Sequence, residues 1–382
     1  MTLKHRMKWL RATLALVALA PLVLATSGQA QLLRVYYPDI EQGSATLIVS
    51  PTGQALLVDA GTGLKSVDEG IENFINDLID AGVLTDIDYT IATHYDEDHI
   101  GRMENVYQYV PMAPGAVAYD RGTFSSTPST FAYSDYAFGA SFHNRTTVTC
   151  STAAYDIDLG GGVTVKFWTV NGEVCEGPTV DVSGASQWEN NVSVSMVIEY
   201  GDVDIWIGGD LTGNTAVGVA DVETPTGVEV MDVDVYTVNH HGSDTSSTTS
   251  FLTDLAAEVA INQSSIENGF GHPRANVVTR ILAAPDSNGN TPLFYQQNPA
   301  DPTDTRADDS LADAIADCDD STFGEVIGLP ATITLLSDGT SYRIHACGIA
   351  ATTSASILYA LDPHRAGLGH EHFVRVLYAH RR

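Results

Sequence analysis

Positive charge is scarce in this chain of 382 residues, which has 18 lysines and arginines against 48 aspartates and glutamates and a formal net charge of −30. Nonspecific nucleic-acid binding depends on cations that replace counterions on phosphates, so this composition argues against it as the main activity. An acidic surface also repels polyanions at long range. A small or short anionic substrate that is held by metal ions stays compatible with the composition.

Long apolar runs are lacking after the first thirty residues. The chain starts with a basic segment, Lys4 to Arg11, followed by an apolar stretch, Ala12 to Ala25, and by small residues at Gly28 and Ala30. This order is typical of a cleaved secretory signal peptide, here residues 1–30. Since no later segment is apolar enough to span a bilayer, we expect a secreted or periplasmic protein without a membrane span.

The four cysteines do not form a Cys-x-x-Cys pair, which makes a cysteine metal site the weaker interpretation. In an oxidising compartment disulfides are favoured. We predict the pairs Cys150–Cys175 and Cys318–Cys347, although spacing alone does not determine connectivity.

Repeats of solenoid period are also lacking, and short β-rich runs alternate with helical patterns, which indicates one large mixed α/β domain over residues 31–348. Strands are expected at residues 32–37, 45–50, 55–59, 89–93, 163–170, 192–200, 203–207, 233–238 and 259–262. Helices are expected at 66–81, 250–256 and 275–283. Residues 103–185 are interpreted as loops and short strands, with insertions near 111–185 and 284–324. Residues 349–382 are interpreted as a C-terminal tail.

Polar residues follow the ends of several of these apolar strands, namely Asp59, the segment from His94 to His99, Asp210, His240, His241 and His272. Binding groups on loops at strand ends, held by a rigid sheet, are a common way to build a site. We therefore expect these residues to converge, although they lie far apart in the sequence.

The segment Thr93 to Arg102 reads THYDEDHIGR and places two histidines and three acids within six consecutive positions after an apolar run. In a tight turn, residues two apart can face the same way while the next ones face a second centre. His94 with Asp96 could therefore bind one cation, and Asp98 with His99 another. The alternative is an exposed acidic turn with incidental histidines.

Two further signals favour the metal site over an exposed turn. Asp210 follows its own strand in a Gly-Asp pair and is the candidate bridge between two cations. The His-His-Gly-Ser segment at residues 240–243 adds imidazoles, of which only one need bind metal. His241, which precedes the glycine, is the preferred ligand, and His240 would then support the site without binding the metal itself.

Several segments carry a resemblance to a known family, in the same order along residues 34–280: 39–45, 57–61, 93–101, 190–193, 209–210, 240–243 with 246–247, and 271–273. On these segments the chain resembles the metallo-β-lactamase-fold hydrolases, and most closely the extracellular metallo-β-lactamase domain of the competence protein ComEC. The resemblance implies a four-layer αββα sandwich with a dinuclear metal site at one edge of the two sheets.

The chain departs from the general motif of that superfamily, His-x-His-x-Asp-His, because Asp96 stands at the second histidine. Asn190 and Asn191 stand where a further histidine ligand is expected before the Gly-Asp strand. Both departures match the competence-type branch. Oxygen ligands shift the preference from zinc toward manganese or magnesium, and we expect two divalent metal ions, manganese or zinc.

Such a site implies hydrolysis by a hydroxide that two metal ions activate. Asp98 would be a ligand that also orients the nucleophile, while His272 and Ser243 would contact the substrate or its leaving group. Asp59 would hold the loop through hydrogen bonds. We predict phosphodiester cleavage, with carboxyl-ester, lactone or β-lactam hydrolysis, or a metal-stabilised binding protein without turnover, as the alternatives.

Overall fold

The structure is a computed structural model that describes residues 32–40, 42–63, 70–124, 127–265, 269–298, 305–307, 309–312, 314–315, 332–346 and 355–360. These residues all belong to one unit, Gln31–Arg382. The expected signal peptide and the expected Cys318–Cys347 pair lie outside the described residues. In the part of the chain that is described, every helix is too short or too polar to cross a membrane.

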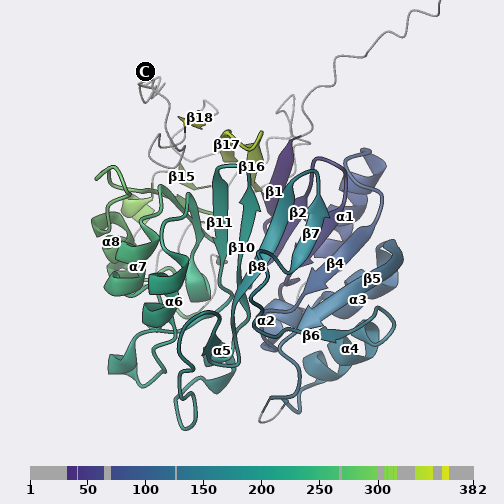
Figure 1. Ribbon diagram of the computed structural model, residues 1–382, viewed down its shortest axis with the longest axis horizontal. Helices are drawn as coiled ribbons and strands as arrows, with labels where there is room; N and C mark the ends of the chain where they lie inside the picture. Colours follow the sequence, from purple (N-terminus) through teal and green to yellow (C-terminus); the bar gives the residue numbers. More distant parts are fainter. Residues whose placement is uncertain are drawn as a thin grey trace, which may run out of the picture. The chain divides into compact units, whose positions relative to one another are not determined.

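The first sheet has nine strands in the order β18-β17-β16-β1-β2-β3-β4-β5-β6 (Figure 1). Its strands are β1 (Leu33–Tyr37), β2 (Thr46–Val49), β3 (Ala55–Val58), β4 (Ile87–Ile91), β5 (Met112–Asp120), β6 (Thr146–Thr147), β16 (Ile333–Ser337), β17 (Ser341–Ala346) and β18 (Ala355–Ala360). β1, β2 and β3 form an antiparallel meander, and β3, β4 and β5 are parallel. β18 comes from the expected C-terminal tail and pairs antiparallel with β17.

The second sheet runs in the order β15-β14-β13-β12-β11-β10-β8-β7, with β9 paired to β8. Its strands are β7 (Ile157–Gly160), β8 (Val163–Val170), β9 (Glu173–Val174), β10 (Ser195–Tyr200), β11 (Val203–Ile207), β12 (Val235–Thr237), β13 (Val259–Asn262), β14 (Leu293–Gln296) and β15 (Ala314–Ile315). β10 and β11 pair antiparallel and form a hairpin. The strands from β11 to β15 are parallel.

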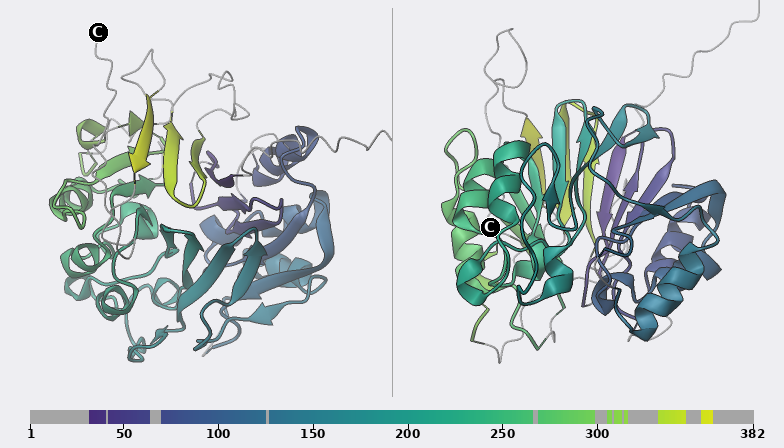
Figure 2. Two further views of the ribbon diagram at one scale, coloured as in Figure 1. Left: turned by 45° about the horizontal axis from the view of Figure 1, so that its top comes forward. Right: turned by 60° about the horizontal axis from the view of Figure 1, so that its bottom comes forward.

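Helices cover the outer face of each sheet (Figure 2). The α-helices are α1 (Ile71–Asp80), α2 (Glu97–Ile100), α3 (Met103–Tyr109), α4 (Phe131–Ala140), α5 (Trp188–Asn191), α6 (Glu223–Val230), α7 (Thr249–Leu255) and α8 (Ala275–Ala283). Three short 3₁₀ segments are η2 (Thr215–Val217), η3 (Asn239–Gly242) and η4 (Asp309–Leu311). The helices α1, α3 and α4 pack on the first sheet, and α6, α7 and α8 pack on the second.

Side-chain alternation along the strands explains the layers. In β3, Leu56 and Val58 belong to the core between the two sheets, whereas Leu57 belongs to the core beneath the helices of the first sheet. In β11, Ile205 faces the other sheet and Trp206 faces the helices. Both sheets are therefore apolar on both faces, and the structure confirms the αββα sandwich.

Residues 103–185 differ from the expected loops and short strands. They contain α3 and α4 and the nine-residue strand β5, which is hydrogen-bonded to β4 inside the first sheet. Helix α4 gives no one-sided apolar pattern, because Phe131 is 90% exposed and Phe138 64% exposed while Tyr136 is fully buried. β5 starts with Met112, Ala113, Pro114 and Gly115, a composition that does not indicate a strand.

Glu223, the first residue of α6, is fully buried and holds the segment that contains the two adjacent histidines. Its carboxylate accepts hydrogen bonds from the backbone N–H groups of Ser247 (2.7 Å) and Thr248 (2.9 Å) and from the side-chain amide of Asn239 (2.8 Å). Burial raises the pKa of Glu223 to about 7, against the lowering effect of these donors.

We predict a pH-dependent stability contribution from Glu223. Because its pKa is higher in the folded protein than the ordinary 4.5, its contribution is complete below pH 4.5 and is lost as the pH rises through about 7. In Glu223→Gln this dependence disappears. Urea unfolding of both proteins from pH 4 to 8 should show the wild-type free energy of unfolding falling relative to the variant by about 3 kcal/mol. An exposed control, Asp135→Asn, should follow the wild type. Parallel curves for wild type and Glu223→Gln would contradict the assignment.

Candidate metal centre

The expected site residues follow strands whose carboxyl ends meet at one edge of the sandwich. Asp59 follows β3 and His94 follows β4 in the first sheet, while Asp210 follows β11 and the histidine pair follows β12 in the second. β3 and β4 are parallel, as are β11 and β12. Figure 1 shows α2 and α5, the short helices beside the site, near the same lower end of the strands. The structure thus brings together residues up to 182 positions apart, from Asp59 to His241.

Three of these residues have backbones in the left-handed region, with φ of +58° at Asp59, +50° at His240 and +53° at His241. This conformation is uncommon for residues other than glycine and is retained where the surrounding structure requires it. Here it turns each side chain out of its strand direction. Asp96 lies just before α2, so that Asp98 and His99 project from the first helical turn.

Two overlapping groups of side chains could each hold a metal ion. The first consists of His94, His99 and Asp210, and the second of Asp98, His99 and His241. Within each group, one nitrogen or oxygen atom from every residue lies within 4.8 Å of the others. Asp96 lies beside the first group, with its Oδ2 3.6 Å from His94 Nε2, and its side chain is 45% exposed.

Hydrogen bonds on the far side of two imidazoles determine which nitrogen faces the centre. Nδ1 of His241 lies 2.9 Å from the backbone carbonyl of Gln263, which can only accept, so Nδ1 carries the proton. Nδ1 of His99 donates in the same way to Asp59 Oδ2 at 2.8 Å. The Nε2 lone pairs of His99 and His241 then face each other at 3.2 Å. Two neutral acceptors at that distance need a cation or a proton between them.

The carboxylate of Asp59 also positions His94. It accepts from the backbone N–H of Thr93 at 2.8 Å and from the Thr93 hydroxyl at 2.7 Å. Because the Thr93 hydroxyl donates its one hydrogen bond to Asp59, its oxygen can only accept from His94 Nδ1, which lies 3.1 Å away. His94 Nε2 is buried and has no hydrogen-bond partner among the described residues. A buried imidazole lone pair without a partner fits a metal ligand, and imidazole with carboxylate is a usual ligand set for zinc or manganese.

The neighbouring His240 has a different environment from His241. Its Nδ1 lies 2.6 Å from the Thr245 hydroxyl, and its Nε2 lies 3.1 Å from the Asn190 amide nitrogen and 3.3 Å from Asp210 Oδ2. His241 Nε2 instead lies 3.4 Å from Asp98 Oδ2. The geometry therefore places His241 between Asp98 and His99, and His240 beside Asn190.

Electrostatics in the centre are dominated by the buried carboxylate of Asp210. Burial acts to raise its pKa, but His240, His99 and His241 outweigh burial and hold the pKa well below its usual range. Burial acts to lower the pKa of His99, but Asp210 and Asp59 raise it well above its usual value. The centre thus attracts positive charge strongly, whether from protons or from metal ions.

The centre opens into a cavity of about 450 Å³. The three residues expected to act on the substrate, Asp98, His272 and Ser243, all line it. Burial, together with the nearby histidines, lowers the pKa of His272 to about 2. Arg274 is the one lysine or arginine among the described lining residues, and its Nε is buried without a hydrogen-bond partner.

Sequence reasoning missed several contacts that position the site. Gln42 donates to Asp98 Oδ2 at 3.3 Å, and Asn190 donates to Asp210 Oδ2 at 3.1 Å. Both lie in segments that carry the family resemblance, which was the available signal. Arg121 forms two 2.7 Å hydrogen bonds with Glu189 in α5. Only the fold shows this pair.

The structure confirms the disulfide Cys150–Cys175, with a Cα–Cα distance of 5.0 Å. It joins the segment before β7 to the segment after β9, at the side of the second sheet where β7, β8 and β9 pair. It lies outside the metal centre, so it stabilises the neighbouring loops and has no ligand role.

We predict that Asp59→Asn weakens metal binding by about 10- to 100-fold while the protein stays folded. The new amide group would donate toward His99 Nδ1 and move the imidazole proton to Nε2, the atom that faces the centre. Titration of manganese or zinc into the metal-free protein, with circular dichroism as the folding check, measures the effect. Asp88→Asn is the matched control, since Asp88 also accepts a backbone N–H, that of Ala55, outside the centre. Equal affinities for wild type and Asp59→Asn would overturn the role given to Asp59.

The solved structures that resemble the chain include the metallo-β-lactamase fold protein YhfI of Bacillus subtilis, at 12% identity and a TM-score of 0.41, over 69% of this chain and 96% of that one. A protein of unknown function from Enterococcus faecalis V583 matches at 13% identity and a TM-score of 0.31, over 74% and 73%. A diphosphatase of the PhnP family matches at 12% identity and a TM-score of 0.37, over 68% and 95%. Among curated proteins, none matches significantly.

A family model gives the assignment. The model described as the metallo-beta-lactamase superfamily matches residues 38–261, more than half of the chain. The matched range contains β2 to β12, most of β13 and every residue of the two metal-binding groups. The chain therefore belongs to the metallo-β-lactamase superfamily.

Proposed function

We propose that the protein is a metal-dependent hydrolase that cleaves phosphodiester bonds in a small or short anionic substrate. The superfamily consists mostly of metal-dependent hydrolases. The observation that carries the proposal is the orientation of three imidazoles, whose Nε2 atoms converge on Asp210 while the Nδ1 atoms of all three are engaged elsewhere. Two divalent cations, manganese or zinc, are the proposed cofactors. Their proposed ligands are His94, Asp96, Asp98, His99, Asp210 and His241, with His240 as the alternative to His241.

When bound, the two cations would supply an activated water and neutralise negative charge on the substrate. Asp98 is placed to accept a hydrogen bond from a water in the cavity, because its side chain is 26% exposed and Gln42 holds one of its oxygens. Ser243, whose Oγ accepts from the Thr245 hydroxyl at 3.1 Å, can donate its own proton to a substrate oxygen. His272 is held neutral by burial and contacts the substrate as a hydrogen-bonding group.

Arg274 supports an anionic substrate over an uncharged ester. Its backbone N–H donates to the carbonyl of Gly242, which fixes it next to the histidine pair. Its buried Nε can donate to a phosphate oxygen, and a guanidinium matches phosphate geometry well. An uncharged ester or lactam would leave the buried Nε of this half-buried cation without a partner.

We propose further that the chain is related to the competence-type branch and acts outside the cytoplasm. Asp96 and Asn190 stand at positions where that branch departs from the general motif, and the structure places both beside the first group of proposed ligands. The leader-like residues 1–30 and the Cys150–Cys175 disulfide support a secreted or periplasmic location.

The expected activity can be tested with bis-p-nitrophenyl phosphate. Chelation should abolish hydrolysis, and manganese or zinc should restore it. Asp98→Ala should lower kcat by at least about a hundredfold, whereas the exposed control Asp80→Ala should leave it unchanged. A panel of carboxyl esters, lactones and β-lactams, run in parallel, distinguishes phosphodiester cleavage from the other reaction classes.

Full activity on the panel compounds with none on any phosphodiester would reject the proposal. Unchanged hydrolysis in Asp98→Ala at intact metal content would contradict the role given to Asp98, and rates no higher than the uncatalysed background in both proteins would indicate a binding protein.

The role of Arg274 gives a separate prediction. Arg274→Gln should raise KM for an anionic phosphodiester by about tenfold with a smaller change in kcat, because the lost contact is made in both ground state and transition state. Arg34→Gln, on β1 and away from the cavity, is the matched control. If Arg274→Gln changed KM for an uncharged ester as strongly, the contact would not be with phosphate.

A further inference from the structure

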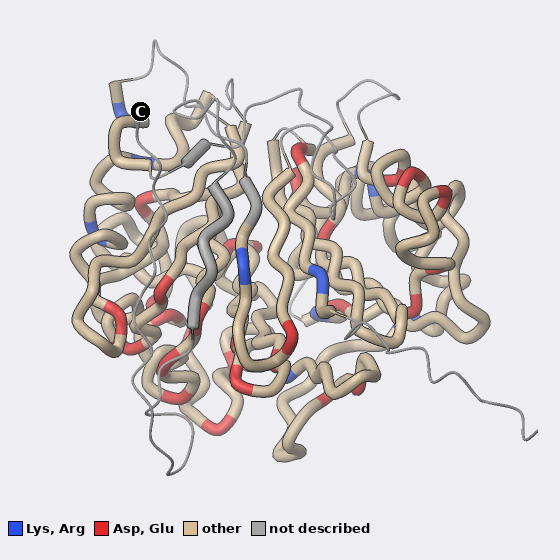
Figure 3. Tube along the Cα trace, turned by 90° about the horizontal axis from the view of Figure 1, so that it is seen from above, with Lys and Arg blue, Asp and Glu red and all other residues tan. Residues whose placement is uncertain are grey.

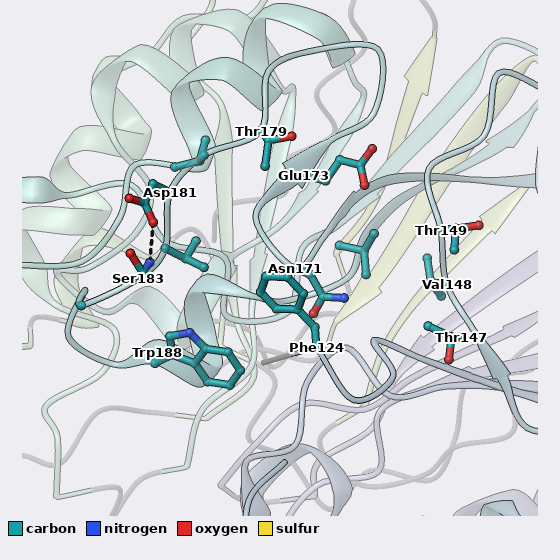
Figure 4. A pocket seen from close by; sticks show the side chains of 14 residues that line it. Phe124, Thr147, Val148, Thr149, Asn171, Glu173, Thr179, Asp181, Ser183 and Trp188 are labelled. Carbon is teal, nitrogen blue, oxygen red and sulfur yellow. Dashed lines mark hydrogen bonds between the residues drawn. The ribbon is translucent and has the colours of Figure 1, made fainter. Parts of the chain in front are cut away.

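A second cavity, of about 820 Å³, lies against the first one. Trp188, the first residue of α5, lines both cavities. Figure 4 shows Asp181, Ser183 and Trp188 at one side of the second cavity and the segment 147–149 at the other. Its volume is in the range of small-molecule sites. No role in the metal centre accounts for it.

The lining of this second cavity has an unusual chemical character. Among its fourteen described lining residues there is no lysine or arginine, while Glu173 and Asp181 contribute exposed carboxylates. Two large aromatic rings, Trp188 and Phe124, also line it, and Phe124 is 46% exposed. Figure 3 shows the same excess of acidic over basic positions along the described part of the chain. The lining therefore disfavours phosphate or another anion.

Aromatic faces and carboxylates together favour a positively charged organic group. A substituted ammonium ion is attracted to the negative face of an aromatic ring and to carboxylates, while its alkyl groups pack on the ring. The guanidinium of Arg121 lies 5.1 Å from the centre of the Trp188 ring, but its charge is balanced by Glu189 at 2.7 Å. It therefore gives little net repulsion toward a second cation.

We propose that this cavity binds an organic cation, a substituted ammonium group such as that of choline. The disulfide supports a preformed site, because Thr149 directly precedes Cys150, and Glu173 lies two residues before Cys175. It thereby ties together two chain segments that both bear lining residues of the cavity. Trp188 connects the cavity to the centre, since Asn190 in the same helix contacts Asp210.

This shared wall extends the inference to the substrate, a step that rests on the proposed function. A phosphodiester with an ammonium group on one alcohol could place its phosphate at the metal centre and its cationic group beside Trp188. The anionic and cationic parts of one molecule would then meet oppositely charged surroundings. The proposed substrate class is a zwitterionic phosphodiester.

Binding can be tested on the metal-free protein, independently of hydrolysis. The probes are choline and its uncharged isostere 3,3-dimethyl-1-butanol, followed by calorimetry or by chemical shifts of the tryptophan side chains. Choline should bind at least about fivefold more tightly than the isostere. Equal binding of both compounds would overturn the proposed charge selectivity, and binding of neither would show that the cavity is not a site.

Variants locate the binding. The double variant Glu173→Gln, Asp181→Asn should weaken choline binding about fivefold and leave the isostere unchanged. Phe124→Leu should weaken both probes, because it removes a ring that packs on either. Asp80→Asn with Asp135→Asn is the matched control for lost exposed charge and should match the wild type. Unchanged choline binding in the first double variant would overturn the assignment to this cavity.

Kinetics test the connection to the metal centre. With metal added, the Glu173→Gln, Asp181→Asn variant should raise KM about fivefold for p-nitrophenyl phosphorylcholine and not for bis-p-nitrophenyl phosphate. If both substrates are hydrolysed and neither KM changes, the connection is wrong. If neither substrate is hydrolysed, the proposed function fails, while the binding result on the metal-free protein stands or falls independently.

Discussion

The buried carboxylate of Asp210 is the constraint on which the centre depends. It is 2% exposed, and burying an isolated carboxylate costs several kcal/mol unless positive charge compensates it. His99 and His241 lie 3.1 and 3.6 Å from its Oδ1, and His240 lies 3.3 Å from its Oδ2. Without metal, protons on the imidazoles supply this charge, as the raised pKa of His99 indicates. Metal ions and protons therefore compete for the same lone pairs, and metal binding releases protons.

The convergence on Asp210 could be predicted from local patterns. Short runs of apolar residues predict the strands. Asp59, His94 and Asp210 each follow such a run closely, which predicts that they lie in loops at a sheet edge. Strand order was not needed for this inference, because the carboxyl ends of parallel strands in one sheet share an edge. The family resemblance supplied the remaining step, that the edges of two separate sheets meet. The exposure of the site residues, the tautomers of the histidines and the distances between ligand atoms could be read only from the structure.

Other parts of the site depend on tertiary contacts that no local pattern carries. The proton position on His241 is determined by the backbone carbonyl of Gln263, and any residue type offers such a carbonyl. The pairing of Arg121 with Glu189 joins residues 68 positions apart that have no distinctive neighbours in sequence. The second cavity is made of common residue types, and only their arrangement around Trp188 distinguishes it. Sequence patterns identify site residues where the chemistry needs a particular residue type, such as histidine or aspartate. They do not identify contacts that depend only on where the fold places common groups.

Charge balance links the metal ions to substrate binding as well as to catalysis. The first cavity is lined by the carboxylates of Asp96, Asp98 and Asp210 and by one unpaired cation, Arg274, while Glu189 is neutralised by Arg121. In the metal-bound centre, where the histidines are neutral, these groups sum to −2 before the metal ions are counted, and two divalent cations change the local sum to +2. A positive centre attracts an anionic phosphodiester against the repulsion from the net charge of −30. The metal ions would thus favour the entry of an anion, and an ammonium group in the acidic second cavity would reduce the remaining long-range repulsion.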